Sequence, residues 1–398
     1  MLKYFKLKYI FIFLICIWNP IQLFILKFDG AQRSIGILVI LTFLVNIGNT
    51  NFMRSGFRTP VIYWGMWVIY AFINTLLIKY NFTIPYYTFF IILIVPFIVI
   101  WIITADNFDD RDILFNIIII GLFIRMILIF LFDSGSMGDV KRLGSSMDSN
   151  DIASYALILI VFLYLKYLYE GFDLKILLLL ILFPLYVIFT TASRNAFGGF
   201  IILLVSHFYI HRSKYIVSNF AIFLFVAVFI IVTLYFVSEK TYLGQRLSST
   251  TEQGSRSDYD LNGTIFEKFG DRGIFYILGF ELFKDHPIRG IGLGNFSTYQ
   301  SHKMMMHSEV MTQLCELGII GTILFLLFYG WIGKSLLRCR KEIVEDRKIT
   351  EAYFSGFIII LFMGLSIFQY YNPAFFLLSG AMIAHVIYAK GKNKSKNL

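Results

Sequence analysis

Long apolar runs follow one another along most of the chain, separated by short polar connections. Each run has about 20 residues, the length that a helix needs to cross the hydrocarbon of a bilayer. We therefore expect an all-α integral membrane protein with about 12 membrane-spanning helices. The expected spans lie near 8–28, 34–50, 60–78, 86–105, 112–132, 151–169, 174–192, 195–211, 215–237, 309–332, 351–370 and 373–389.

Basic residues gather in alternate connections, a pattern that orients spans with their cationic loops in the cytoplasm. An even number of spans puts both termini on one side, so we expect both in the cytoplasm. The connection at 106–112 is also expected in the cytoplasm, but it is acidic and contains a single Arg. This does not change the assignment, because acidic residues contribute little to the rule. The residues expected in the cytoplasm are Lys3, Lys6, Lys8, Arg54, Arg58, Arg212, Lys214, Arg338, Arg340, Lys341, Arg347, Lys348 and the lysines from Lys390 to Lys396.

Composition agrees with a membrane protein. Hydrophobic residues make up 58% of the 398 residues and charged residues 15%, whereas a soluble domain is about one-quarter charged. We interpret residues 1–398 as one polytopic membrane domain, with its first apolar run retained as a span because no small-residue cleavage pattern follows it. Topology explains the net charge of +10 better than a nucleic-acid partner does. Three cysteines without paired spacing predict neither a disulfide framework nor a zinc site.

Three connections expected outside the membrane carry unusual polar content: 133–151, the turn 191–195 and the loop 238–307. In the first, Asp148 and Asn150 precede a span, where capping of the helix and a functional role are both open. Arg142 has no use as a cap, because the helix dipole disfavours a cation at an N-terminus. In the second, Arg194 lies between two apolar runs. Its side chain either extends to lipid headgroups or faces a polar cavity, where its planar donor fork suits a phosphate.

The large extracytoplasmic loop, 238–307, has two parts. Residues 238–270 are rich in Ser, Thr, Gly and Asp, which is typical of irregular chain. Residues 271–286 predict a short amphipathic helix over the outer face, with Asp271 as its N-cap and an end before Pro287. The apolar spacing that predicts this helix is carried by Ile274, Ile277, Leu278 and Leu282.

Glycines then alternate at Gly290, Gly292 and Gly294. No βαβ unit precedes them, so a dinucleotide loop is not expected. We expect these glycines to let the chain turn closely over other backbone, with amides that are also suited to phosphate. These glycines lie a short distance along the chain before the next predicted helix. His307 stands where that helix should begin, with Ser308 as its cap and Glu316 farther along.

Histidines at 286, 302 and 307 match no common metal-ligand spacing, so we expect separate polar side chains and no metal site. The stretch from Asp285 to Gly321 resembles the O-antigen ligase and polymerase superfamily. The family pattern is Pro-x-x-Gly-x-Gly-x-Gly-Asn-Phe, then a His usually followed by Asn, then Leu-x-Glu-x-Gly-x-x-Gly. This chain departs from the pattern at Ser308. The resemblance extends over about 140–330, the family-like catalytic region, where Arg142, Asn150, Arg194 and Arg272 also look like family features.

The resemblance implies glycosyl transfer from an undecaprenyl-diphosphate-linked oligosaccharide to an acceptor glycan hydroxyl, at the outer face of the bacterial cytoplasmic membrane, without cofactor or metal. Guanidinium groups suit the negative charge that develops on the leaving phosphate. Arg194 and Arg272 are the first candidates, followed by Arg142 and Arg256. His307 suits the role of general base, although binding of the diphosphate stays open. We also expect Asn150, Gly292, Gly294 and Glu316 to contribute to substrate binding.

Within this family we expect a polymerase of O-antigen or capsular repeat units. Three other functions are alternatives to it. An O-antigen ligase would transfer the glycan to lipid A core or another surface acceptor. A transporter or flippase for a lipid-linked oligosaccharide would need ionisable residues near the midplane of several spans, but Arg125 is the clear mid-span charge. A purely structural membrane protein would leave the external Arg and His residues unused. In the polymerase reading, a chain-length regulator and a flippase are expected partners.

Overall fold

The structure is a computed structural model that describes residues 7–21, 58–78, 111–137, 140–143, 148–211, 271–299, 306–342, 347–370 and 372–396. This part of the chain is helical except for one hairpin, in which β1 (Ser134–Met137) pairs antiparallel with β2 (Val140–Leu143). The all-α prediction is confirmed for the fold class, and the hairpin is an element that it did not include. The two residues between the strands are Gly138 and Asp139, a pair that favours hairpin turns.

Six described helices are long and apolar enough to cross a membrane. The prediction of a helical membrane protein is confirmed in this form, whereas the count of spans and the cytoplasmic position of both termini stay predictions. The expected spans at 34–50, 86–105 and 215–237 lie outside the described residues. The candidate spans fall within α3 (Arg58–Leu77), α5 (Arg111–Phe132), α6 (Ser149–Glu170), α7 (Leu174–Thr191), α12 (Glu309–Glu342) and α14 (Pro373–Lys396).

Helix α6 is the centre of one bundle. Its side chains from Ile152 to Leu165 are all buried, and it packs against α5, α7, α8 (Arg194–His211), α13 (Arg347–Met363) and α14. Capping fixes its ends: the Asp148 side chain accepts the N–H of Asn150, and Gly171 ends the helix in the left-handed conformation, where glycine carries no steric penalty. On the outer side of α7, large apolar side chains are exposed, as expected of a helix that faces lipid.

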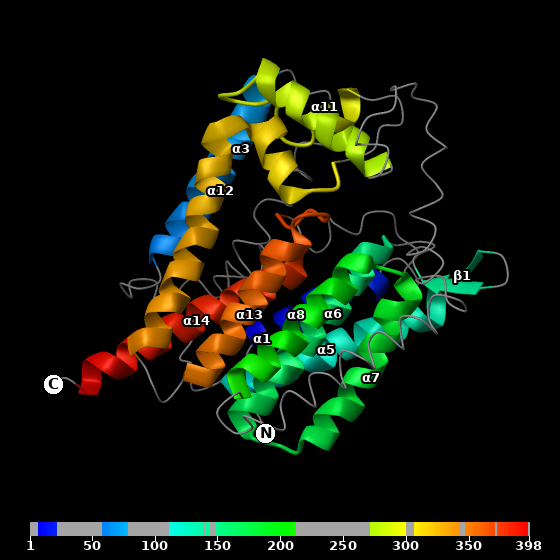
Figure 1. The fold of residues 1–398 in the computed structure, drawn as a ribbon, viewed down its shortest axis with the longest axis vertical. Helices are drawn as coiled ribbons and strands as arrows, with labels where there is room; N and C mark the ends of the chain where they lie inside the picture. Colours follow the sequence, from blue (N-terminus) through cyan, green and yellow to red (C-terminus); the bar gives the residue numbers. More distant parts are fainter. Residues whose placement is uncertain are drawn as a thin grey trace.

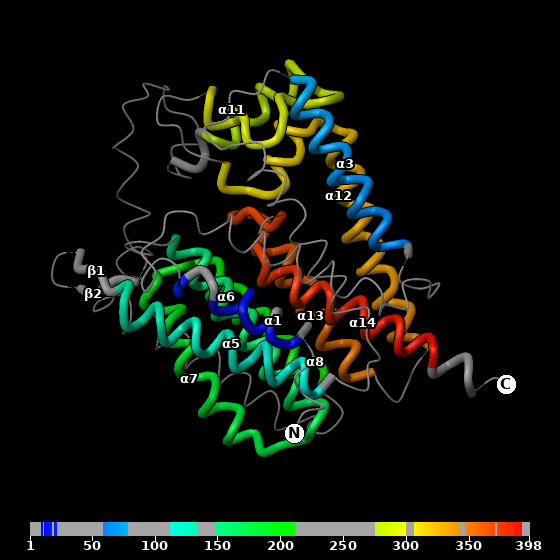
Figure 2. Tube along the Cα trace, turned by 180° about the vertical axis from the view of Figure 1, so that it is seen from behind, coloured from blue at the N-terminus to red at the C-terminus, as the bar shows by residue number. Residues whose placement is uncertain are grey.

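A second group of helices stands beside this bundle (Figures 1 and 2). Helix α3 runs along α12, and α11 (Asp271–Asp285) packs against α12 near its start. Trp64 and Trp67 of α3 stack on each other with ring centroids 4.7 Å apart, and both contact Phe325 of α12. These aromatic contacts hold α3 along α12. A short helix, α1 (Leu7–Pro20), packs on α5 in the other group.

Some predicted boundaries differ from the structure, and the predicted end of α11 agrees. Helix α12 extends to Glu342 and is broken at Gly318, whereas a single span at 309–332 was expected. Helix α13 ends at Met363 and not at 370, because the chain turns from Gly364 onward. The described helix α11 already includes Asp271, which we had expected as the cap before it. Its end at Asp285, before Pro287, confirms the prediction.

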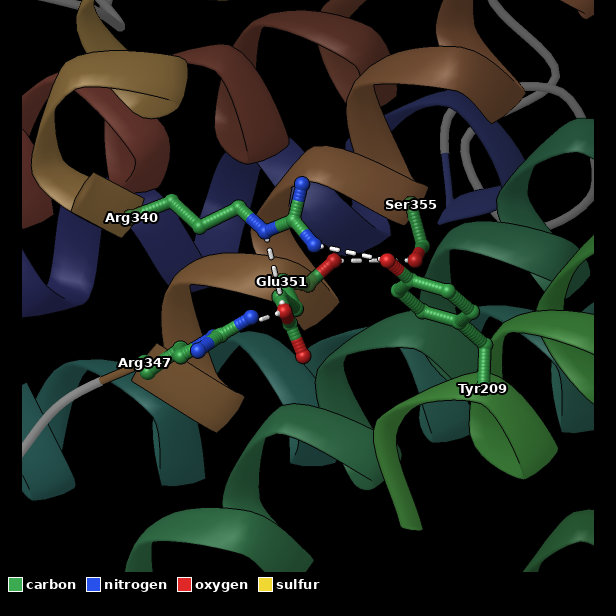
Figure 3. A network of polar contacts seen from close by, with 5 residues as sticks. All are labelled: Tyr209, Arg340, Arg347, Glu351 and Ser355. Carbon is green, nitrogen blue, oxygen red and sulfur yellow. Dashed lines mark hydrogen bonds and ion pairs between the residues drawn. The ribbon is translucent and has the colours of Figure 1, made fainter. Parts of the chain in front are cut away.

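At the far end of α12 from α11, basic residues form a polar network (Figure 3). Glu351 of α13 pairs with Arg340 at 2.9 Å and with Arg347 at 3.2 Å. Arg340 also donates to the Tyr209 hydroxyl at 2.7 Å, which joins α8 to α12. Arg338, Lys341 and Lys348 are exposed nearby in the sequence. Five of the residues that predicted a cytoplasmic face thus lie at or near this end of α12.

Candidate functional site

Residues 287–292 replace part of the hydrogen bonding of helix α12. In an unbroken helix, the N–H groups of residues 319 and 320 would bind the carbonyls of residues 315 and 316. Here Ile319 donates to Pro287 O at 2.9 Å and Ile320 to Ile288 O at 3.5 Å. The released carbonyls of Cys315 and Glu316 accept the N–H groups of Ile291 at 3.0 Å and Gly292 at 2.7 Å. Four bonds therefore join the glycine loop to the break in the helix.

Two glycines make this close approach possible. Gly290 has φ +68°, and a Cβ atom there would lie 2.4 Å from the carbonyl carbon of Glu316. Gly318 has φ +64°, and a Cβ atom there would lie 2.4 Å from the carbonyl oxygen of Ile288. Only a residue without a side chain fits such positions without strain. The prediction that the alternating glycines let the chain turn closely over other backbone is confirmed at Gly290, whereas the role of Gly318 was not predicted.

The carboxylate of Glu316 holds the rest of the glycine loop. Its Oε2 accepts the N–H of Gly294 at 2.7 Å, and its Oε1 accepts the N–H of Phe296 at 3.1 Å. The side chain is 3% exposed, so the two bonds compensate for burial of the carboxylate. The N–H groups of Gly292 and Gly294 already have protein partners. A role of Gly292, Gly294 and Glu316 in substrate binding stays a prediction.

The end of α3 also binds the glycine loop, which our reading of the sequence did not anticipate. The amide of Asn74 donates to Arg289 O at 2.7 Å and accepts from Arg289 Nε at 3.3 Å. The hydroxyl of Thr75 accepts the N–H of Leu293 at 3.0 Å. An Asn-Thr pair near the end of an apolar run was the available signal, because buried polar side chains need partners.

His307 lies two residues before the first residue of α12 and is half-buried. Its ring stacks on Phe368 with centroids 6.1 Å apart and lies 6.4 Å from the ring of Phe275 in α11. The next residue, Ser308, caps the helix, since its carbonyl accepts the N–H of Thr312 at 2.9 Å. The predicted start of the helix at this histidine is confirmed, and the ring lies between two other segments of the chain.

The predicted residues at the start of α6 and α8 form a second group. The hydroxyl of Ser193 donates to Asn150 Oδ1 at 3.1 Å. Asp148, and none of the three residues after it, caps α6 with its side chain. The turn between α7 and α8 is tight, with Ala192 in the left-handed region and Arg194 as the first residue of α8. Arg194 is exposed and directly follows Ser193 in the chain.

The other predicted residues lie elsewhere in the chain. Arg142 belongs to β2 and Arg272 to the first turn of α11. Arg256 and His302 lie outside the described residues. His286 is exposed at the end of α11. Within the described ranges, no group of three or more His, Cys, Asp or Glu side chains has the arrangement of a metal site.

Comparison with known proteins agrees with the motifs. No curated protein matches the chain. The family model described as O-antigen ligase matches residues 177–326, which include α8, α11, the glycine loop and the start of α12. The resemblance predicted from the residues between 285 and 321 is thereby confirmed, and it extends over the stretch that the family model matches, residues 177–326.

Proposed function

We propose that this protein transfers a glycan from undecaprenyl diphosphate to a hydroxyl group of an acceptor glycan, and that it polymerises O-antigen or capsular repeat units. One observation carries the proposal: residues of the family pattern, far apart in the chain, are bonded into one unit. The glycine loop, the break at Gly318 and the Glu316 carboxylate interlock, and His307 lies at the start of the same helix.

In this proposal, arginines stabilise the charge of the departing diphosphate. Breaking the bond between sugar and diphosphate leaves negative charge on phosphate oxygens, which a planar guanidinium binds through two parallel hydrogen bonds. Arg194 is exposed next to the Ser193–Asn150 bond, which suits this role. Arg272, Arg142 and Arg256 are the further candidates. No step in this scheme requires a metal ion or a nucleotide sugar.

His307 is proposed to accept the proton of the acceptor hydroxyl. An imidazole titrates near neutrality and can therefore take up a proton as the new glycosidic bond forms. Its ring is only partly buried, and Phe275 and Phe368 restrict its orientation. Restricting a catalytic group in this way lowers the entropy that is lost when the reaction geometry forms. Binding of the diphosphate by the same imidazole is the alternative role.

The proposed site of action is the outer face of the bacterial cytoplasmic membrane. The basic residues of α12 and α13 gather at the opposite end of α12 from the glycine loop (Figures 1 and 3), and cationic loops favour the cytoplasm. This arrangement supports an external catalytic loop. A chain-length regulator and a flippase are the proposed partners, because the repeat units must reach the outer face before they are joined.

A lipid-linked oligosaccharide transporter is the alternative from another class. Its main support was Arg125 in the middle of α5. Arg125 is 1% exposed, and its guanidinium donates to Cys16 O at 3.2 Å and lies 3.6 Å from the centre of the Tyr155 ring. Its contacts are thus with the protein, as expected of a side chain that joins helices. This favours the enzyme.

Gene deletion with complementation tests the proposal. The deleted host would receive the wild-type gene or His307→Ala, and its surface and lipid-linked glycans would be separated on a gel. A polymerase predicts loss of the ladder, with single repeat units still attached to lipid acceptor. Full-length glycan that accumulates on undecaprenyl diphosphate would indicate the ligase. An unchanged profile would contradict both the polymerase and the ligase and would favour the transporter.

A further inference from the structure

Glu309 is a buried carboxylate that the proposed chemistry does not use. It is the first residue of α12 and is 1% exposed. Its Oε1 accepts the Gln313 side-chain amide at 2.6 Å, and its Oε2 accepts the backbone N–H groups of Gln369 and Tyr370. Among the described residues, no cationic side chain pairs with it. Three N–H donors on one buried carboxylate form a specific arrangement, because each lost bond would leave a buried polar group unsatisfied.

The donors Gln369 and Tyr370 belong to the connection between α13 and α14, residues 364–372. The backbone of this connection binds the same helix start a second time, since the N–H of Glu309 donates to Gly364 O at 2.8 Å. Its Phe368 carries the ring on which His307 stacks. One segment therefore holds Glu309 and supplies the surface against which the imidazole lies, and only Ser308 separates His307 from Glu309 in the chain.

The other end of the connection binds the start of α6, next to the second group of candidate residues. The Asn372 amide donates to Asp151 Oδ1 at 3.2 Å and to Ser154 Oγ at 3.3 Å, both on α6. Asp151 directly follows Asn150, which accepts the hydroxyl of Ser193. In both views of the fold, the turn between α13 and α14 lies between α11 and the helices around α6 (Figures 1 and 2). The connection thus joins His307 to the residues around Arg194.

We propose that Glu309 is a positioning residue, which fixes His307 against the α13–α14 connection and thereby sets its place relative to the Asn150–Ser193–Arg194 group. This inference rests on the proposed role of His307. A catalytic group must be held to within a fraction of an ångström, and displacement by about 1 Å lowers the rate on the order of a hundredfold. Glu309 does not touch substrate in this proposal. It acts through the backbone amides of residues 369 and 370.

Glu309→Gln is the first test, because glutamine has the same shape but one acceptor oxygen and an NH2 group that cannot accept the backbone N–H. The assay measures transfer by the purified full-length protein in lipid nanodiscs, with lipid-linked repeat units extracted from host membranes. We expect kcat to fall on the order of tenfold or more, while KM for the lipid-linked donor changes less than twofold. A rate unchanged per folded molecule would overturn the proposal.

A double-mutant cycle with His307→Ala separates positioning from any independent effect. If Glu309 acts through His307, the double variant should be no slower than His307→Ala alone. If the two losses multiply, this inference is wrong while the proposed role of His307 stands. If His307→Ala leaves the rate unchanged, both fail. If Glu309→Gln does not fold, Phe368→Leu replaces it in the cycle, because this substitution removes the ring on which His307 stacks. The double variant with His307→Ala should again be no slower than His307→Ala alone.

Glu351→Gln is the matched control. It makes the same change at a carboxylate that is 8% exposed, but at the basic end of α12, where it pairs with Arg340 and Arg347. We expect a lower thermal unfolding midpoint with an unchanged rate per folded molecule. An equal fall in kcat for Glu351→Gln and Glu309→Gln would show that general loosening of the helices explains both, and would overturn the positioning role.

Discussion

The carboxylate of Glu316 and the backbone N–H of Gly294 are 2.7 Å apart, although one belongs to a membrane-length helix and the other to a glycine loop. Non-helical backbone within a membrane protein is tolerated where the protein satisfies its polar groups. The break at Gly318 and the loop at 287–296 satisfy each other in this way. Neither element is complete alone, so substitutions in either should disturb both.

Glu316→Gln should destabilise this unit. Glutamine replaces one acceptor oxygen with an NH2 group, so either Gly294 or Phe296 loses its partner. A hydrogen bond to a charged group contributes about 2 kcal/mol, and an unsatisfied buried N–H adds a penalty. We expect a thermal unfolding midpoint several degrees below that of the wild type, measured by intrinsic fluorescence in detergent. An unchanged midpoint would show that the two amides do not depend on the carboxylate.

Alanine at Gly318 should be far more disruptive than alanine at Gly330 of the same helix. At Gly318, the new Cβ would meet Ile288 O at 2.4 Å with φ at +64°, whereas at Gly330 nothing lies within 4 Å. Strain and clash together are expected to cost more than about 2 kcal/mol. Gly330→Ala should be neutral or slightly stabilising, because alanine is the better helix former. The measurement is the yield of monodisperse protein and its unfolding midpoint.

The apolar runs were sufficient to predict most described helices, because burial in lipid demands about 20 apolar residues whatever their neighbours are. The break in α12 was not predictable in this way. Gly318 lies in an apolar run that reads as continuous helix, and its conformation depends on carbonyls of residues 287 and 288, about 30 residues earlier in the chain. The hairpin at 134–143 was missed because eight residues in two short strands give little alternation.

The candidate site shows the same division between local and distant information. Ser308 and the start of α12 follow from local capping, so they were predictable. The side chains of Asn74, Glu309 and Asn372 bind partners 60 or more residues away, and Glu309 also accepts a local bond from Gln313. Each is a polar residue at the end of an apolar run. The sequence marks such a residue as one that needs a partner, but it does not identify that partner.

Thr75→Val should weaken the contact between α3 and the glycine loop. Valine has the shape of threonine without the hydroxyl, so the N–H of Leu293 would be buried without an acceptor. We expect a loss of about 1–2 kcal/mol in the free energy of unfolding. Thr190→Val is the matched control, because its hydroxyl bonds to carbonyls of its own helix at Tyr186 and Val187 and, within the described residues, to no other segment. Equal losses in the two variants would exclude a specific role of the bond to the loop.

Arg194→Lys should impair transfer although the positive charge is retained. The guanidinium offers a planar fork of donors that can bind two phosphate oxygens at once, whereas the lysine ammonium is a single compact charge. If Arg194 binds the leaving diphosphate, the rate of glycan transfer should fall on the order of tenfold or more, as expected when one transition-state donor is lost. The control is Arg338→Lys. Arg338 is exposed near the end of α12 that lies away from the glycine loop, so this substitution should leave the rate unchanged. Full activity of Arg194→Lys would mean that a single charge is sufficient at this position and that the bidentate contact does not exist. Full activity of Arg194→Ala would remove the residue from the proposed mechanism.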